Sequence, residues 1–562
     1  MTHDEELRWF DGFKATLPYK RFEERPIAYF CAEYALENGI KTYSGGLGIL
    51  AGDMVREAQD RKLPLVAVGL YYHEGYLCEV KETDGKPIET CVSVPPASVG
   101  LEPVRDAKGE PLRLHVPIQD HEVLVQAWIW RKDGVSVYLL DTDVEANEPK
   151  DRQITNRLYV ADKETRFKQE MVLGIGGLRL LEALEIHPSV YHLNEGHSAF
   201  LTLELVRHQM KERRIGFDEA KQFARRRTAL TNHTLLPAGN ETYSNDLAAL
   251  QLARYADELG VPVAEVVKLG LVQESSVFSM TMLAFRMSAI INSVSRLHAK
   301  KAKEIWTDHP MVAVTNGVHL PTWDRIASDV SAKGAFWKRH QELKGDLLKE
   351  IREKTGRAWG SEELLLGWAR RTVKYKRPLA VIEDAKRFAA IARNADRPVR
   401  IVFSGHPHPS DEDGQKLLKD LRAVIDGELS DVAAYLPGYD MENAKRLVAG
   451  CDIWLNTPVV GFEACGTSGM KAALNGALPL STKDGWVAEA ELFKVGWLLD
   501  DARIGTDALD LIEKEIVPTY YARTTEGVPE PWEEYMRNSR DMIVNQFSAT
   551  RMLREYIEML YS

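Results

Sequence analysis

The chain has 562 residues, of which 44% are hydrophobic and 28% are charged, so it can form large globular cores. Its formal net charge of −11 argues against a nucleic-acid-binding protein, which would carry a basic surface. The longest apolar stretch, residues 63–72, is too short to cross a bilayer, and the acidic N-terminus lacks the apolar segment of a signal peptide. We therefore expect a cytoplasmic protein that binds neither nucleic acid nor membrane.

Cysteine usage supports the same location. The chain has an odd number of cysteines and no C-x-x-C pair; they are Cys31, Cys78, Cys91, Cys451 and Cys465. This pattern argues against a disulfide framework and against a cysteine-rich metal site, and it favours a reducing compartment. No metal is expected.

The N-terminal half begins with the pattern of a parallel α/β layer. An apolar run at residues 27–31 predicts a buried strand, a glycine-rich turn follows at 44–48, a helix is expected at 53–61 and a second strand at 65–71. Further strand-like runs occupy residues 123–130 and 135–140.

The C-terminal half repeats this pattern. Residues 336–369 are rich in charge and helical in pattern. After them, helical stretches alternate with strand-like runs at 399–403, 432–436, 452–456 and 477–481. The sequence therefore predicts an α/β fold with two doubly wound domains facing across a cleft, with ligands at the carboxyl ends of the strands.

We place the domain boundary at residue 316, which gives an N-terminal domain of residues 1–316 and a C-terminal domain of residues 317–562. The chain closes on a helix whose apolar residues Met552, Leu553, Tyr556 and Leu560 recur at helical spacing, with Ser548 or Thr550 as its N-cap. A helix with so apolar a face must pack on something, and it could dock back on the first domain.

The most informative segment is residues 463–476, which follows the strand at 452–456 and opens a helix near Thr467. Its glycines let backbone N–H groups approach an anion, and the helix N-terminus adds a favourable dipole, so Gly466, Thr467 and Ser468 could hold a phosphate. A plain glycine-rich helix start explains the loop equally well. Lys471 could form a Schiff base with an aldehyde cofactor whose phosphate occupies the helix end, although a solvated lysine is the commoner case.

A basic run at residues 370–377 places five cations within eight positions of an acidic chain: Arg370, Arg371, Lys374, Lys376 and Arg377. Guanidinium groups bind phosphate through two hydrogen bonds and ammonium groups bind it as point charges, so such a run suits two nearby phosphates. Taken alone, a charge run is more commonly a solvated surface.

These two segments resemble the cofactor-attachment motif and the phosphate-binding segment of the α-glucan (glycogen and maltodextrin) phosphorylases, in a short bacterial and archaeal branch. The resemblance extends over residues 27–561 and implies two Rossmann-like domains of the GT-B glycosyltransferase type. In the related glucan synthases that use nucleotide sugars, two glutamates stand eight positions apart on this element. Here Glu463 is followed eight positions later by Lys471, which favours a phosphorylase.

The resemblance implies a role for each matching residue. Lys471 is the Schiff-base lysine of pyridoxal 5'-phosphate, and the C-terminal domain is the one that binds this cofactor. The other cofactor-binding residues are Arg370, Tyr439, Gly466, Thr467 and Ser468. Arg371 and Lys376 bind the substrate phosphate and, with His233, form the catalytic set.

The N-terminal domain is implied to bind the glucan. The substrate-binding residues are Gly45, Gly46, Glu195, His197, Asn316, Tyr375, Glu463 and Cys465. For Glu195 and His197, a buried polar network that only supports the cleft wall is an equally good interpretation. His233 and Asn316 rest on the resemblance alone, because a structural histidine and an Asn-Gly turn are the simpler explanations.

The implied activity is that of a hexosyltransferase, which uses inorganic phosphate to release α-D-glucose 1-phosphate from the non-reducing ends of an α-1,4-glucan with retention of configuration. Two residues depart from the family pattern: His406 stands where a lysine is common, and Cys465 replaces a serine. A nucleotide-sugar glucan synthase and a glucan-binding protein without catalysis remain as alternatives, and His406 faintly favours the second. The preferred glucan, a homo-oligomeric state and the physiological direction stay open.

Overall fold

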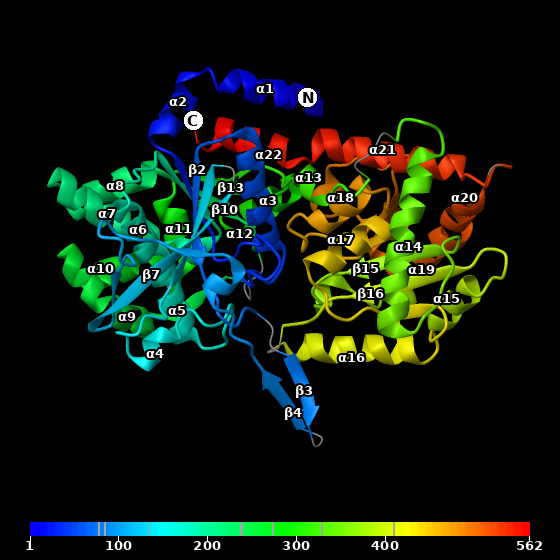
Figure 1. The fold of residues 1–562 in the computed structure, drawn as a ribbon, viewed down its shortest axis with the longest axis horizontal. Helices are drawn as coiled ribbons and strands as arrows, with labels where there is room; N and C mark the ends of the chain where they lie inside the picture. The colour runs from blue at the N-terminus through cyan, green and yellow to red at the C-terminus, as the bar shows by residue number, and fades with distance from the viewer. Residues whose placement is uncertain are drawn as a thin grey trace. The chain divides into compact units, whose positions relative to one another are not determined.

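The computed structural model describes residues 1–562 except 77–78, 84–85, 133, 236–239, 273–274, 327–329, 409–410, 526 and 562. The chain forms two compact units (Figure 1). Unit 1 consists of Met1–Glu6, Ser295–Lys300 and Thr315–Met552, and unit 2 of Leu7–Val294, Lys301–Val314 and Leu553–Ser562. Each unit is built on a largely parallel sheet, so the predicted α/β fold class is confirmed.

The sheet of unit 2 has ten strands. Their order is β14-β13-β10-β9-β1-β2-β8-β7-β5, with β6 paired to β7. Neighbours from β14 to β8 are parallel, and β7 is antiparallel to β8. The strands are β1 (Ile27–Phe30), β2 (Leu65–Leu70), β5 (Glu102–Pro103), β6 (Leu114–Ile118), β7 (His121–Lys132), β8 (Val135–Asp141), β9 (Val190–Asn194), β10 (Thr228–Asn232), β13 (Ile290–Ser293) and β14 (Val312–Ala313).

Helices cover this sheet. They are α2 (Leu17–Glu24), α3 (Gly46–Arg61), α4 (Pro149–Arg152), α5 (Lys163–Met171), α6 (Gly177–Ala183), α7 (Phe200–Arg213), α8 (Phe217–Arg226), α9 (Asn245–Leu259), α10 (Val263–Val267) and α11 (Met280–Met287). Strands β1 and β2 are buried at every position, which is why they read as continuous apolar runs in the sequence. Helices α1 (His3–Phe13) and α12 (Arg296–Ile305) each contribute residues to both units.

Helix α3 begins earlier than the sequence pattern indicates. It starts at Gly46, inside the glycine-rich segment, rather than at Asp53. A side chain at Gly48 or Gly52 would collide with Glu33 or with the carbonyl of Ala35, in the segment after β1. The glycines therefore let the first turns of the helix lie directly on that segment, and the predicted turn is mostly helix.

The sheet of unit 1 has six strands, all parallel to their neighbours. In spatial order they are β17 (Ala433–Tyr435), β16 (Val399–Ser404), β15 (Leu364–Ala369), β18 (Ile453–Asn456), β19 (Leu478–Thr482) and β20 (Trp497–Leu499). Numbered along the chain, this is the order 3-2-1-4-5-6 of a doubly wound sheet. The four strands predicted after residue 369 are all present.

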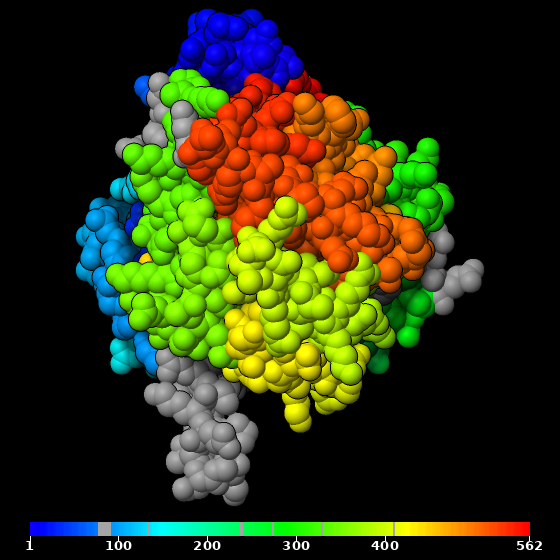
Figure 2. Space-filling model, turned by 90° about the vertical axis from the view of Figure 1, so that its right-hand side faces the viewer, coloured from blue at the N-terminus to red at the C-terminus, as the bar shows by residue number. Residues whose placement is uncertain are grey.

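The helices of unit 1 lie on both faces of this sheet. Helices α15 (Ala385–Ala392) and α16 (Glu412–Asp426) connect β15, β16 and β17. Helices α14 (Ala335–Thr355), α17 (Met441–Gly450), α18 (Thr467–Leu474) and α21 (Glu530–Gln546) pack against one another, and Figure 2 shows α14 and α21 side by side. Residues 336–369, which were expected to be helical, contain two elements: α14 ends before Gly356, whose φ of +73° suits glycine, and the segment then enters β15.

The chain ends in α22 (Ala549–Met559), close to the predicted position. Of the two expected caps, Ser548 accepts the backbone N–H of Arg551 at 3.3 Å. Tyr556 is buried, and the hydroxyl of Tyr561 lies 2.6 Å from Nδ1 of His192 on β9. The end of the chain is thus anchored in unit 2 by a buried hydrogen bond.

In the described part of the chain, every helix is too short or too polar to cross a membrane. Cys31, Cys451 and Cys465 are free and buried, whereas Cys91 takes part in a disulfide. This corrects the expectation drawn from cysteine usage; Cys78 lies outside the described residues. Cys91 directly follows β4 (Lys86–Thr90), which forms a hairpin with β3 (Glu79–Thr83), and cysteine spacing alone does not reveal such a pairing.

Candidate active site

The topology of unit 1 brings the two predicted phosphate-binding segments together. The strand order reverses between β15 and β18, and ligands of doubly wound sheets bind in the crevice outside the strand ends at this point. β15 ends at Ala369, directly before the basic run. β18 ends at Asn456, directly before the loop that leads to Glu463 and α18. Segments about ninety residues apart in the chain therefore share one edge of the sheet.

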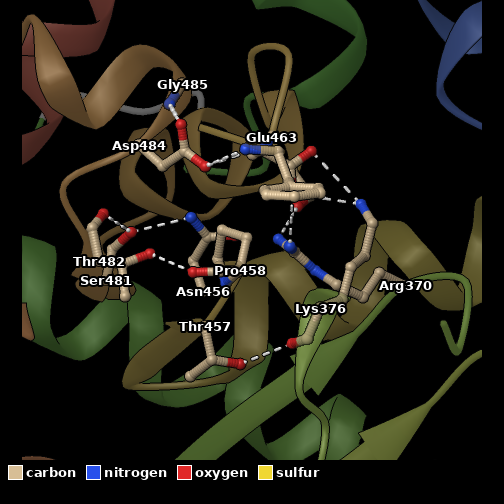
Figure 3. A network of polar contacts seen from close by, with 12 residues as sticks. Arg370, Lys376, Asn456, Thr457, Pro458, Glu463, Ser481, Thr482, Asp484 and Gly485 are labelled. Carbon is tan, nitrogen blue, oxygen red and sulfur yellow. Dashed lines mark hydrogen bonds and ion pairs between the residues drawn. The ribbon is translucent and has the colours of Figure 1, made fainter. Parts of the chain in front are cut away.

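At this edge, one carboxylate lies between two cations (Figure 3). Nη1 of Arg370 is 3.0 Å from Oε2 of Glu463, and Nζ of Lys376 is 3.3 Å from Oε1 and 3.2 Å from Oε2. The side chains of Arg370, Lys376 and Glu463 are 6%, 14% and 9% exposed, so water screens this cluster only weakly.

The cluster carries more positive than negative charge, because two cations contact one carboxylate. Burial alone would raise the pKa of Glu463, but Lys376 and Arg370 hold that pKa below its ordinary value. Burial lowers the pKa of Lys376 to about 8; the charge of Glu463 opposes this shift, and the guanidinium groups of Arg370 and Arg371 add to it. Two cations contact the carboxylate of Glu463 and the charge of Arg371 also reaches the cluster, so a further anion would be stabilised here.

The remaining members of the basic run lie around this cluster. Arg371 is exposed and near enough to act on the pKa of Lys376. Nζ of Lys376 is 5.4 Å from the centroid of the Tyr375 ring. Tyr439, predicted beside the cofactor, reaches the start of the run, where its hydroxyl lies 3.4 Å from the carbonyl oxygen of Ala369.

Asp484 holds the loop that carries Glu463, and it is not among the residues predicted from the sequence. Its Oδ2 accepts three successive backbone N–H groups, from Gly461 at 3.0 Å, Phe462 at 3.2 Å and Glu463 at 2.9 Å. Its Oδ1 accepts the N–H of Gly485 at 2.8 Å (Figure 3). The only available signal was its position, three residues after the predicted strand at 477–481, at the same edge of the sheet.

Lys471 lies inside unit 1 rather than in solvent. It is 5% exposed, and its Nζ is 3.9 Å from the centroid of the Trp323 ring. Asn475 joins these two segments, because its Nδ2 donates at 2.8 Å to the carbonyl oxygens of both Lys471 and Trp323. Trp323 and Asn475 were not predicted as site residues, since their contacts join segments far apart in the chain. The interpretation of Lys471 as a solvated lysine is wrong.

The start of α18 has the geometry expected of an anion-binding turn. Gly466 is the N-cap residue in the left-handed conformation with φ of +83°, which favours glycine, and Thr467 opens the helix. The hydroxyl of Ser468 lies 3.2 Å from Nη2 of Arg370, so the helix start and the cation cluster are in direct contact. The buried Nε atom of Arg370 has no hydrogen-bond partner among the described residues.

Two predicted sugar-binding residues lie together beside this turn. Cys465 is 3% exposed, and burial raises the pKa of its thiol, opposed in part by a hydrogen bond from the backbone of Asn316. Asn316 is 5% exposed, and within the described chain its Oδ1 atom has no hydrogen-bond partner. A buried amide oxygen of this kind is suited to accept a hydrogen bond from a ligand hydroxyl.

Unit 2 has its own cluster of predicted residues at the ends of β9 and β10. The carboxylate of Glu195 accepts the backbone N–H of His233 at 2.7 Å, and Oδ1 of Asn194 is 2.6 Å from Nε2 of His233. Burial raises the pKa of Glu195 to about 8, although the His233 N–H lowers it in part. Glu195 also has a φ of +74°, an uncommon conformation for a residue with a side chain and typical of functional sites.

The other predicted residues of unit 2 are His197, Gly45 and Gly46. Burial lowers the pKa of His197 to about 3, so the ring is neutral at ordinary pH, and in the part of unit 2 that is described its Nδ1 lacks a hydrogen-bond partner. The N–H of Gly45 donates to Oε2 of Glu33 at 3.3 Å. The space beside Gly45 and Gly46 is open to at least 4 Å, so a ligand could reach this backbone.

His406 does not replace the positive charge of a lysine. Its Nδ1 lies 3.3 Å from the hydroxyl of Tyr435, and burial together with the charge of Arg422 lowers its pKa. The ring is therefore neutral at ordinary pH. It makes no contribution to the positive charge of unit 1.

Unit 1 is a doubly wound unit whose switch point gathers two cations around one carboxylate, with a buried lysine on the helix that follows, and such an arrangement is suited to binding phosphate groups. The sequence model of the carbohydrate phosphorylase family matches residues 179–323 and 312–494. A maltodextrin phosphorylase of Thermococcus litoralis is 37% identical over 99% of this chain and 72% of its own length. Glycogen phosphorylases of Mycobacterium tuberculosis and Aquifex aeolicus are 34% and 32% identical, over 95% and 97% of this chain and 70% and 87% of their own lengths.

The chain belongs to the carbohydrate phosphorylase family. The resemblance read from the basic run and from the segment around Lys471 is therefore confirmed.

Proposed function

We propose that this chain is an α-1,4-glucan phosphorylase, which uses inorganic phosphate to release α-D-glucose 1-phosphate from the non-reducing ends of a glucan with retention of configuration. Its relatives are named for maltodextrin and glycogen, which are both α-1,4-glucans. The observation that carries the proposal is the contact of Arg370 with both Glu463 and Ser468, since it joins an anion-binding cluster to the helix of Lys471.

The residues of unit 1 fit pyridoxal 5'-phosphate. Lys471 offers a buried amine, the Gly466 turn with Thr467 and Ser468 offers a helix start, and the buried Nε of Arg370 still requires a partner. Tyr439 would lie at the edge of the same site. When bound, the cofactor supplies a phosphate group whose second pKa near ~6 lets it exchange a proton at neutral pH.

The chain's own residues would act on phosphate and sugar. Arg371 and Lys376 hold the substrate phosphate, which protonates the glycosidic oxygen and forms the new bond to the anomeric carbon as the old C–O bond breaks. Glu463, Asn316 and the backbone at Cys465 orient the sugar hydroxyls. Tyr375 lines the sugar pocket.

In unit 2, we assign His233 to the glucosyl unit being transferred. Glu195 and His197 complete the sugar-binding set there, and the open backbone of Gly45 and Gly46 is the part that approaches phosphate.

The cytoplasmic location belongs to this proposal, although the Cys91 disulfide weakens the inference of a reducing compartment from cysteine usage. A homo-oligomeric state stays a prediction.

The test is borohydride reduction of the purified protein followed by peptide mass mapping. We expect a pyridoxyl-phosphate adduct on Lys471, and Lys471→Ala should lose both the adduct and the phosphate-dependent release of glucose 1-phosphate. Lys416→Ala is the matched control, because this lysine of unit 1 is 78% exposed on α16. Retained phosphorolysis in Lys471→Ala would sink the cofactor assignment, and activity with a nucleotide sugar instead of phosphate would establish a synthase.

A further inference from the structure

Phe462 is an exposed aromatic residue, and the residue that follows it in the loop, Glu463, is buried. Ten large hydrophobic side chains are exposed in the described part of the chain, and two of them, Val460 at 39% and Phe462 at 46%, stand just before Glu463. Scattered apolar side chains on a surface need no explanation. An apolar pair directly before a residue of a polar site is different, because ligand sites combine aromatic walls with a few placed polar groups.

The exposure of Phe462 does not come from a loosely held loop. Asp484, which is fully buried, accepts the backbone N–H groups of Gly461, Phe462 and Glu463 through a single oxygen. On the other side, the N–H of Val459 donates to the carbonyl oxygen of Tyr375 at 2.8 Å. The backbone is therefore fixed on both sides of Phe462, and this fixed conformation presents the ring to solvent.

The ring lies beside another aromatic residue of the site. Its centroid is 6.2 Å from that of Tyr375, and the two planes are inclined by 31°. The ammonium group of Lys376 lies 5.4 Å from the Tyr375 centroid, and Glu463 is the next residue in the chain. The two rings thus border the cation–carboxylate cluster and differ from it in polarity.

We propose that Phe462 and Tyr375 form an aromatic wall that binds the C–H face of a glucosyl residue, and that Phe462 determines how tightly the glucan is held. This inference rests on the proposed function and extends it to a residue with no assigned role. A pyranose ring has hydroxyl groups at its rim and C–H groups on its faces. Glu463 and the cations suit the hydroxyls and the phosphate, whereas the rings can only offer an apolar, π-rich surface.

The test compares Phe462→Ala with the wild-type holoenzyme. We expect the KM for maltoheptaose to rise about five- to tenfold, the size of effect that an aromatic contact provides, while the KM for phosphate stays as in wild type. Phe462→Leu retains apolar area without a ring and should weaken glucan binding by an intermediate factor. Phe462→Trp retains an aromatic ring and should bind the glucan as wild type does. Phe493→Ala is the matched control, since this phenylalanine of unit 1 is 78% exposed and lies outside the cluster; its kinetics should match wild type.

Calorimetric titration with maltoheptaose separates this inference from the proposed function. If the wild-type protein releases glucose 1-phosphate but Phe462→Ala binds maltoheptaose as wild type does, the aromatic wall is wrong and the function stands. If the wild-type protein releases none, the function fails, and weaker binding by Phe462→Ala would still support the wall. Equal losses in Phe462→Ala and Phe493→Ala would also overturn the inference, because they would indicate a general surface effect.

Discussion

The ammonium group of Lys376 lies 3.2 Å from Oε2 of Glu463, and this contact joins the segment after β15 to the loop after β18. Arg370 shares the same carboxylate at 3.0 Å. A buried ion pair contributes little net stability when its partners are balanced, but an unbalanced cluster is sensitive to any change in charge. Removing the charge of Glu463 should therefore lower the stability of the protein.

Glu463→Gln should make the stability of the protein depend on phosphate. Removing the shared charge leaves buried cations uncompensated, so the free energy of unfolding should fall by about 3 kcal/mol in a buffer without phosphate. Added phosphate should restore part of this loss, because an anion at the cluster replaces the carboxylate. Urea denaturation of the variant with and without phosphate measures both effects.

The control for this prediction is Glu442→Gln, which removes a half-buried carboxylate paired to Lys445 on α17. Water still reaches this pair, so the stability of the control variant should change by less than about 1 kcal/mol and should not depend on phosphate. A Glu463→Gln protein that is as stable as wild type without phosphate would show that the cluster is not electrostatically strained.

Phosphate binding should weaken as pH rises through about 8, the pKa of Lys376 in the free protein. The protonated ammonium group attracts phosphate, so its contribution is present below that pKa and is lost above it. The KM for phosphate, measured on both sides of this pH, should therefore increase on the alkaline side. Lys376→Arg keeps its charge throughout and should abolish this increase. An unchanged pH profile in the arginine variant would assign the titration to another group.

Some of the buried parallel strands were predictable from the sequence. β1 and β2 are continuous apolar runs, and their residues identified them in the sequence. β10 was not predicted, because its last residues, Thr231 and Asn232, are polar. β15 was not predicted either, because the charged helical pattern before it extends up to the strand. Local pattern therefore located strands made of apolar residues and missed a strand with a polar end and a strand directly preceded by a charged helix.

The site was predictable as two segments but not as a network. The glycines, the basic run and Lys471 are visible because each is a local cluster. Asp484, Asn475 and Trp323 are single residues whose importance comes from contacts with distant segments. No spacing rule reveals such contacts, since the partners meet only after the sheet has formed.

In unit 2, Glu195→Gln should change how stability depends on pH. Because burial raises the pKa of Glu195 from 4.5 to about 8, the folded protein holds a proton that the unfolded chain has lost between these values. Wild-type stability therefore falls as pH rises from 4.5 to about 8, by up to about 5 kcal/mol, and then levels off. Glutamine carries no charge and retains an oxygen for the His233 N–H. The stability of the variant should therefore lack this fall and should exceed that of wild type most above pH 8.

Glu204→Gln is the opposite control. Arg207 and Arg179 hold the pKa of the buried Glu204 low, so that variant should lose stability at neutral pH and approach wild type in acid. Urea denaturation across this range would contradict the prediction if wild type and Glu195→Gln changed in parallel.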